Sequence, residues 1–361
     1  MPTPRRSPLA LAIALAVAAS ACTGGAEEPA GSDARLKVAF FQDLSIEDPL
    51  DLVSPSFLAL EAGLAQAAED GTSGVPIPVQ FDTGGDPVAA LESARTVAAD
   101  DAYVAVVAAP FWTMPEDVAT VVAEAGLPVL SLSDGPRPQA PGLVWRRFVA
   151  PAPAQADALA ARAGAATRGT ICVVSDDTIR AEALASAVGE RLGDRAVART
   201  AADVDACGAV VWTGGPSGAA ALRVSLPDER PLLVADAAKT AAYLDEAIPA
   251  SDGTVAVCPC VDVTTATDLP ARRFVNVYQA ATGLAPGVFA AEGWGIASLL
   301  AGIAEGSPEA DRAAYLAGVD AVTGVPGPGG PIAFDAQGEP LGASREARAS
   351  EAAGRRWLPL G

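Results

Sequence analysis

Apolar and amphipathic runs alternate along most of the chain, and residues 103–134 show the repeating unit clearly. An apolar run, YVAVVAA, precedes a short loop, then EDVATVVAEAG, in which valines recur every three or four positions, and finally LPVLSLSD. This spacing places the valines on one face of a helix, and the flanking runs are typical of parallel strands covered on both faces. Thr113 and Glu116 have the spacing of a capping box, and Gly126 stands where a helix ends. The pattern predicts a strand–loop–helix–strand unit.

The same alternation extends over residues 36–263 and predicts an α/β protein with two lobes, each built on a doubly wound parallel sheet. A segment dense in proline and glycine, Asp134–Gly142, interrupts it. After residue 263 the chain becomes helical, which suggests a return to the first lobe, and it ends in short strands. The expected helices cover residues 56–68, 179–192, 271–282 and 289–305, and others are opened by Asp86-Pro87 and Ser307-Pro308. We expect residues 36–146 and 264–323 to form the first lobe, and residues 147–263 and 324–361 the second.

In such sheets, ligands bind where loops leave the carboxyl ends of the strands. In the unit described first, these loops are Pro110–Met114 and Ser131–Asp134. We therefore expect the functional site at these two loops.

Residues 1–21 have the features of a signal peptide. Two arginines precede the apolar segment Leu9–Ala19, which is too short to span a bilayer, and small residues stand directly before Cys22. This junction resembles a bacterial lipobox, which implies cleavage before Cys22 and lipidation of its thiol. Ordinary secretion with an incidental cysteine is the alternative, and the export route, general or twin-arginine, stays open. Residues 22–35 are rich in glycine, proline and acids and are expected to form a flexible tether.

The chain is strongly acidic. Its 24 basic and 44 acidic residues give a formal net charge of −20, and loss of residues 1–21, which contain two arginines and no acids, makes this −22. Such a charge disfavours nucleic acid as a partner, and it leaves the lipid on Cys22, rather than a basic face, to hold the protein at a membrane.

Four further cysteines are present, and the chain has no histidine. An exported protein can form disulfides. Cys172 begins one predicted strand and Cys207 directly precedes another, so a Cys172–Cys207 disulfide is possible. Cys258 and Cys260 flank a proline and could be free thiols or form a local bridge. Because a zinc site needs more ligands than these cysteines offer, we expect no metal and no cofactor.

Several segments follow one another along the chain in a specific order: LKVAFFQDLS, Asp86-Pro87 before a helix, AEAGLPVLSLS, VVSDD, PLLVAD, ARRFVNVYQAATGLAPGVFAAEGWGIASLLAGI and GPIAFDAQGEP. These segments and the order of elements resemble the branched-chain amino-acid (Leu/Ile/Val-binding) branch of the solute-binding proteins of ABC transporters, which have the type 1 periplasmic binding protein fold. The resemblance spans residues 36–360. It implies two lobes joined by three crossovers, at Asp134–Gly142, Val263–Asp268 and Gly324–Gly330, with ligand enclosed between the lobes by hinge closure.

The resemblance also implies which residues hold the ligand. In the family, loops at the strand ends of both lobes bind the α-carboxylate and the ammonium group of an amino acid. The matching positions here are Trp112, Thr113, Ser131, Ser133, Asp134, Arg180, Ser217 and Asp236. Hydroxyl and backbone N–H groups would bind the carboxylate, and Asp236 would bind the ammonium group. Three positions depart from the family: Phe111-Trp112 replaces a small, serine-rich loop, Arg180-Ala181 replaces a Tyr-Gly pair, and Pro216-Ser217 replaces another aromatic residue.

Three of these residues have an alternative role. Arg180 could bind a second anionic group of an acidic ligand, or it could be a solvated residue in the first turn of a helix. Trp112 could stack on a ligand or fill the edge of the lobe. Asp236 could pair with an ammonium group or cap a helix.

We expect a monomeric substrate-binding lipoprotein of an ABC importer, anchored to the outer face of the cell membrane, that binds an amino acid or a related small polar ligand and delivers it to permease subunits. A sensing or ligand-lost binding protein of the same fold is the alternative. Catalysis is disfavoured because general-base chemistry would fall to carboxylates and two lysines, and because the sequence has no G-x-S-x-G motif. The glycine-rich turn TGGPSG also lacks the lysine of a phosphate-binding loop.

Overall fold

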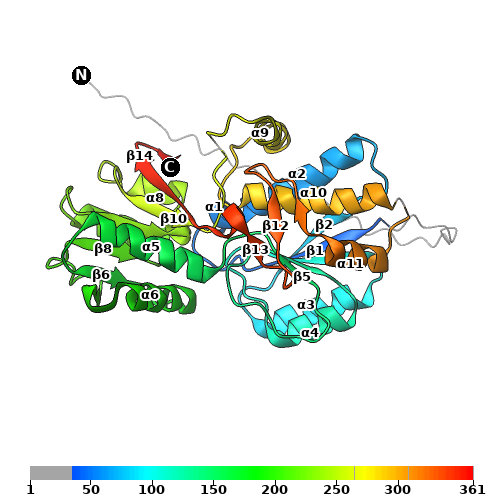
Figure 1. The fold of residues 1–361 in the computed structure, drawn as a ribbon, viewed down its shortest axis with the longest axis horizontal. Helices are drawn as coiled ribbons and strands as arrows, with labels where there is room; N and C mark the ends of the chain where they lie inside the picture. The colour runs from blue at the N-terminus through cyan, green and yellow to red at the C-terminus, as the bar shows by residue number, and fades with distance from the viewer. Residues whose placement is uncertain (1–34, 264, 308, 361) are drawn as a thin grey trace, which may run out of the picture. The chain divides into compact units, whose positions relative to one another are not determined.

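The computed structural model describes residues 35–263, 265–307 and 309–360. The expected signal peptide and the lipidation site Cys22 lie outside these residues, as does nearly all of the expected tether. The described residues contain two large sheets with helices packed on their faces (Figure 1), which is the α/β architecture that the alternating pattern predicted. No helix within these ranges is long and apolar enough to cross a membrane.

The first lobe is built on a five-stranded sheet with the order β2-β1-β3-β4-β5, in which every pair is parallel. Its strands are β1 Lys37–Gln42, β2 Ile77–Asp82, β3 Tyr103–Ala108, β4 Val129–Ser131 and β5 Trp145–Arg147. Its helices are α1 Pro49–Leu52, α2 Ser54–Glu69, α3 Pro87–Ala99 and α4 Glu116–Glu124, joined from later in the chain by α9 Leu269–Thr282, α10 Ala290–Gly306 and α11 Arg312–Ala321. Helices α9 and α10 pack against α2, and α11 packs against β3, so all three lie with the elements of the first lobe.

The second lobe is built on a seven-stranded sheet with the order β15-β14-β10-β9-β8-β6-β7. Its parallel strands are β6 Ile171–Val174, β7 Ala196–Ala198, β8 Ala209–Trp212, β9 Leu232–Ala235 and β10 Val255–Cys258, and its antiparallel strands are β14 Arg348–Ala353 and β15 Arg356–Pro359. Its helices are α5 Ala152–Ala166, α6 Ile179–Leu192, α7 Pro216–Ser225 and α8 Ala241–Glu246, with the 3-10 turns η1 Gly193–Arg195 and η2 Asp236–Ala238.

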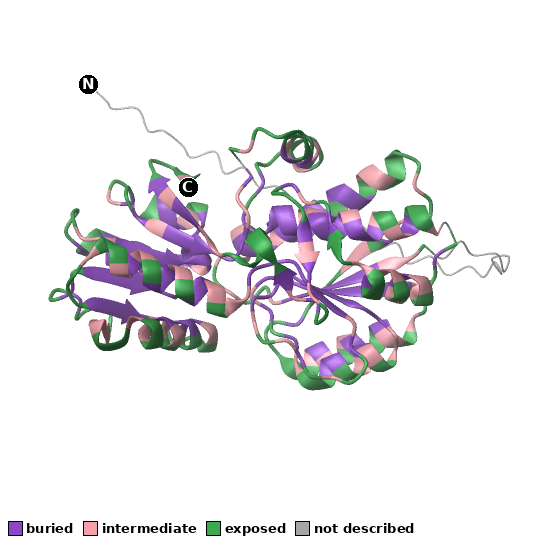
Figure 2. Ribbon diagram, viewed as in Figure 1, coloured by how far each residue is buried: buried purple, intermediate pink, exposed green. Residues whose placement is uncertain are grey.

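Buried strands and close helix packing form the core of the first lobe. Every residue of β3 is buried, and Figure 2 shows the central strands of both sheets as buried. Helices α2 and α10 approach so closely that a Cβ atom on Gly293 would lie 2.2 Å from the carbonyl oxygen of Ser56. A glycine is therefore needed at this position, because a side chain would force the two helices apart.

The segment 324–341 differs from expectation. It forms a small antiparallel sheet of β11 Gly324–Val325, β12 Ile332–Phe334 and β13 Pro340–Leu341, which we expected in the second lobe. Instead, Phe334 packs edge-on against Phe148 in the core of the first lobe, and Glu339 forms a 2.8 Å ion pair with Arg147 of β5. The chain therefore crosses to the second lobe only after β13, through η3 Gly342–Arg345.

Two predictions of helix starts were wrong, whereas the start predicted at Asp86-Pro87 was confirmed. Helix α4 begins after Pro115 and has no side-chain cap, so the Thr113–Glu116 capping box does not form. The helix expected at Ser307-Pro308 is α11, which begins after Asp311. Asp86 does cap α3, and its carboxylate accepts a 2.8 Å hydrogen bond from the amide of Val88.

Candidate functional site

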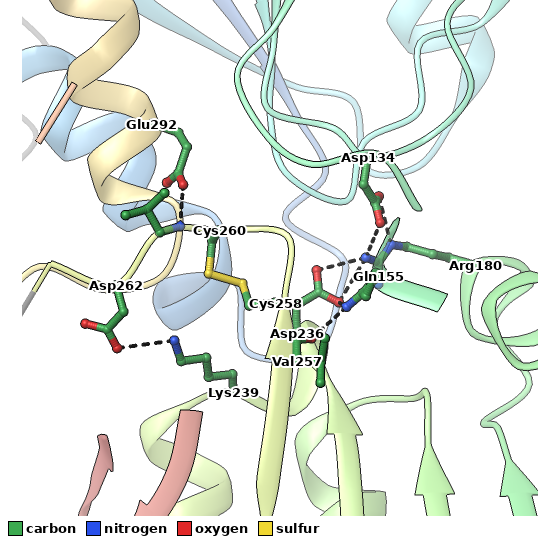
Figure 3. Close-up of a disulfide and its surroundings, with 11 residues drawn as sticks. Asp134, Gln155, Arg180, Asp236, Lys239, Val257, Cys258, Cys260, Asp262 and Glu292 are labelled. Atoms are coloured by element: carbon green, nitrogen blue, oxygen red, sulfur yellow. Dashed lines mark hydrogen bonds and ion pairs between the residues drawn. A yellow bond between two sulfur atoms is a disulfide. The ribbon is translucent and has the colours of Figure 1, made fainter. Parts of the chain in front are cut away.

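Arg180 connects two carboxylates that come from different lobes. Asp134 follows β4 in the first lobe, Asp236 directly follows β9 in the second, and Arg180 lies in the first turn of α6. Its Nη2 atom donates to Asp134 Oδ2 at 2.8 Å and to Asp236 Oδ2 at 2.8 Å, and its Nε atom donates to Asp134 Oδ1 at 3.3 Å. Figure 3 shows the three side chains pointing toward one another. The predicted strand-end residues therefore meet in one charge cluster.

The charge cluster is largely shielded from solvent. The side chains of Asp236, Asp134 and Arg180 are 1%, 7% and 26% exposed. Burial alone would lower the pKa of Arg180, but the charges of Asp134 and Asp236 and their hydrogen bonds outweigh it and raise that pKa. Burial raises the pKa of Asp236, and the charge of Asp134 adds to this effect, whereas Arg180 opposes it. The three groups together carry one more negative charge than positive when all are ionised.

Gln155 of α5 is a fourth member of the cluster that sequence reasoning missed. Its Nε2 atom donates at 2.8 Å to both Asp236 Oδ1 and the carbonyl oxygen of Val257, and the residue is fully buried. The sequence contained a signal for the burial of this residue, because Gln155 stands four positions before the buried Leu159 and therefore lies on the apolar face of its helix. Its second amide atom, Oε1, is buried without a hydrogen-bond partner in the described structure.

Phe111, rather than Trp112, faces the charge cluster. Phe111 has a left-handed backbone (φ 64°), and its ring centroid lies 4.7 Å from Cζ of Arg180 and 5.7 Å from the ring of Phe289. Trp112 is 5% exposed and stacks on Phe41 within the core of the first lobe. Of the two roles that the sequence left open for Trp112, the structure therefore supports the filling of the lobe.

The hydroxyl residues of the first lobe divide into two groups. Ser131 is fully buried, and its Oγ atom exchanges hydrogen bonds with the backbone of Ser133, so it shapes the loop. The hydroxyls of Ser133 and Thr113 converge on Gly135, where a Cβ atom would lie 3.2 Å and 2.9 Å from them. Ser133 Oγ accepts a hydrogen bond from the amide of Gly135, which leaves its own hydroxyl hydrogen for another acceptor.

Ser217 lies apart from the charge cluster, at a second contact between the lobes. Its backbone N–H, in the first turn of α7, donates to Glu47 Oε1 at 3.1 Å. Asp51 of α1 makes a similar contact, because its Oδ2 atom accepts a 2.8 Å hydrogen bond from the amide of Ala241 in α8. Three carboxylates of the first lobe, Asp134, Glu47 and Asp51, therefore bind donors of the second lobe. Sequence reasoning named only the first of them.

The four cysteines of the described residues form two disulfides. Cys172 of β6 is bonded to Cys207, and Cys258 is bonded to Cys260 where the chain leaves β10 (Figure 3). Within the described ranges, no group of three or more histidine, cysteine, aspartate or glutamate side chains is placed to hold a metal ion.

No family model and no curated protein matches the sequence. The structure, however, is similar to an ABC transporter substrate-binding protein from Desulfitobacterium hafniense in complex with Leu, with a TM-score of 0.70, 19% identity, and 90% of this chain and 99% of that chain covered. It is also similar to the branched-chain amino acid transporter substrate-binding protein LivJ from Streptococcus pneumoniae in complex with isoleucine (TM-score 0.71, 14% identity, 90% and 99% covered). A periplasmic binding protein type 1 from Bordetella pertussis matches with a TM-score of 0.70 at 16% identity, again over 90% and 99% of the two chains. The chain has the type 1 periplasmic binding protein fold.

The charge cluster lies at strand ends of both sheets. Asp134 stands at the carboxyl end of β4 and Asp236 at the carboxyl end of β9, which are the positions where open parallel sheets bind ligands. Arg180 pairs with both carboxylates and so connects these two strand ends.

Proposed function

We propose that this chain is the substrate-binding lipoprotein of an ABC importer and that it encloses a small zwitterion, an amino acid or a close relative, between its two lobes. The observation that carries the proposal is the buried contact of Arg180 with Asp134 of one lobe and Asp236 of the other. Extracytoplasmic location and attachment through lipid on Cys22 are part of the proposal, and they rest on the sequence features of residues 1–22.

The charges of the cluster favour a ligand that carries an ammonium group. Two carboxylates, Asp134 and Asp236, face one guanidinium, so a cationic group balances the remaining negative charge. The hydroxyls of Thr113 and Ser133 supply donors for a carboxylate on the first-lobe side. Arg180 is already paired twice, which removes the reason to expect a second anionic group on the ligand.

Ligand entry requires the lobes to separate. Separation breaks the Arg180–Asp134 pair and the contacts of Glu47 with Ser217 and of Asp51 with Ala241. Because the last two contacts lie at exposed positions, each contributes at most about 1 kcal/mol. A ligand that contacts both lobes then stabilises the closed state by its difference in affinity for the two states.

The test is a thermal-shift and calorimetric screen of the Cys22→Ala protein, which should be secreted in soluble form if lipid is the anchor. The panel holds L-amino acids together with their N-acetyl and amide derivatives. We expect at least one free amino acid to raise the unfolding free energy by about 2.7 kcal/mol at 100 times its Kd, and its N-acetyl form to have no effect.

The control pair is Asp236→Asn, which should lose this response, and Glu305→Gln, which changes an exposed acid of α10 and should keep it. A response of equal size from N-acetylated compounds would refute the ammonium assignment. If no compound of the panel binds, the second candidate function is favoured, that of a protein of the same fold that has lost its ligand. The supporting observation for this candidate is that Arg180 pairs with the carboxylate at the strand end.

A further inference from the structure

A cavity of about 380 Å³ lies beside the crossovers between the lobes, away from the charge cluster. We call it the hinge cavity. It is lined by Val261, residues 291–292 at the start of α10, residues 327–333, residues 341–344 and Arg348. Its volume is within the range of about 300–1,000 Å³ that small-molecule sites occupy. None of its lining residues belongs to the charge cluster, so it is a separate place for a ligand.

Glu292 supplies the hinge cavity with a buried carboxyl group. The residue is 1% exposed, and its Oε1 atom accepts a 2.5 Å hydrogen bond from the amide of Val261 (Figure 3). Its other oxygen, Oε2, is buried and has no hydrogen-bond partner among the described residues. Burial raises the pKa of Glu292 to about 7. Because Oε1 is used as an acceptor, a proton on this carboxyl group sits on Oε2, where it becomes a donor without an acceptor.

Arg348, at the start of β14, is the second charged residue of the lining. It is half-buried, and no hydrogen bond or ion pair of its guanidinium occurs within the described residues. The remaining lining includes Ile332, Leu341 and a segment of alternating glycine and proline, and is mostly apolar. The loop reaches Val261 only because Gly329 lacks a side chain, since a Cβ atom there would lie 2.1 Å from Val261 Cγ1.

We propose that the hinge cavity binds a small organic monocarboxylate with a short apolar body. Its carboxylate would pair with Arg348 and accept a hydrogen bond from Oε2 of Glu292, while its hydrocarbon part would contact Ile332 and Leu341. Glu292 and Arg348, the two ionisable residues of the lining, are then both donors to one anion, and the buried oxygen of Glu292 gains the partner that it lacks.

The charged groups around Glu292 affect its pKa and therefore the pH dependence of carboxylate binding. Lys239 and Arg348 are the positive charges that lower its pKa, and Asp262, which forms a 3.4 Å ion pair with Lys239, lies on the same crossover as Val261. Above pH ~7 the carboxyl group of Glu292 is ionised and repels a bound carboxylate, so affinity should fall as the pH rises through this value.

The experiment measures binding of straight-chain carboxylates from propionate to hexanoate by calorimetry, with the matching uncharged amides as controls. We expect binding of one or more carboxylates, no binding of the amides, and a Kd at least about tenfold weaker for Arg348→Gln. Arg345→Gln, which changes an exposed arginine of η3, should bind like the wild type. Equal affinity in Arg348→Gln and the wild type, or no binding by any carboxylate, would overturn the proposal.

Two further variants test the role of Glu292 and distinguish binding in the hinge cavity from binding at the charge cluster. Glu292→Gln keeps a donor at the cavity at every pH, so it should bind carboxylate without the pH dependence of the wild type. Asp236→Asn disables the proposed amino-acid site and should leave carboxylate binding unchanged, so the two proposals can fail independently. If Asp236→Asn lost carboxylate binding, the carboxylate would bind at the charge cluster, and this result would contradict a site in the hinge cavity.

Discussion

One buried carboxyl group, that of Glu292, links the stability of the protein to pH. Its pKa is about 7 in the folded protein, against an ordinary value of 4.5. Between these values the folded protein holds a proton that the unfolded chain has released, so the unfolding free energy should fall as the pH rises from about 4.5 to about 7. The total loss from this group is roughly 3 kcal/mol. Urea unfolding of the wild type and of Glu292→Gln at several pH values measures it.

The comparison with Glu292→Gln isolates this effect from the repulsion among the other acids of the chain. Glu305→Gln removes an exposed carboxyl group from the same helix, and its unfolding free energy should follow the wild-type pH profile. Parallel profiles for the wild type and Glu292→Gln would show that the carboxyl group is not held in its neutral form by burial.

At the level of single residues, the sequence identified members of the site but not their partners. Asp134, Arg180 and Asp236 were each expected near the ligand, yet their mutual pairing depends on how two lobes meet, which no local pattern encodes. The choice between Phe111 and Trp112 depended on one backbone angle. Residues other than glycine rarely adopt positive φ, so nothing in the sequence predicted that Phe111 would do so and face Arg180.

At the level of elements, strands and helices were predictable where one strong pattern decided them. Helix α6 has the predicted bounds, residues 179–192, and begins with the Thr178 side chain accepting a hydrogen bond from the amide of Ala181. The start of α4 was not predictable from the capping-box spacing. Pro115 fixes the backbone directly before the helix, and Thr113 then lies too early to reach its first amides.

The Cys172–Cys207 disulfide should contribute more to stability than the Cys258–Cys260 disulfide. It closes a loop between residues 35 positions apart, whereas the second joins residues two positions apart. On the chain-entropy model the longer loop corresponds to about 4 kcal/mol. We expect Cys172→Ala/Cys207→Ala to lower the unfolding free energy by up to this amount in urea titrations. Cys258→Ala/Cys260→Ala is the matched control, and an equal or larger loss there would contradict the loop-length argument.

At the level of the whole molecule, the two sheets could be predicted, but the first and last crossovers could not. The segment Asp134–Gly142, which we expected to cross between the lobes, instead connects β4 to β5 within the five-stranded sheet of the first lobe. The segment 324–341 is short and apolar at Val325, Ile332 and Phe334, a pattern that fits either lobe. Its place is decided by tertiary contacts, above all by Gly338, where the backbone passes so close to Trp145 that a Cβ atom would lie 1.8 Å from its carbonyl oxygen. Such complementarity between distant segments has no periodic signal in the sequence.

Closure of the lobes without ligand should depend on the Arg180–Asp134 pair. Asp134→Asn removes this charge-assisted contact between the lobes and leaves the pair of Arg180 with Asp236, which lies within one lobe. The loss of about 1.5–3 kcal/mol shifts the equilibrium toward the open state by roughly 10- to 100-fold, so small-angle X-ray scattering of the ligand-free variant should give a larger radius of gyration. Asp157→Asn removes an ion pair with Arg191 that stays within the second lobe, and its scattering should match the wild type. If Asp134→Asn also scattered like the wild type, the other contacts between the lobes, among them those of Glu47, Asp51 and Phe111, would be sufficient for closure, and the role given to the Arg180–Asp134 pair would be wrong.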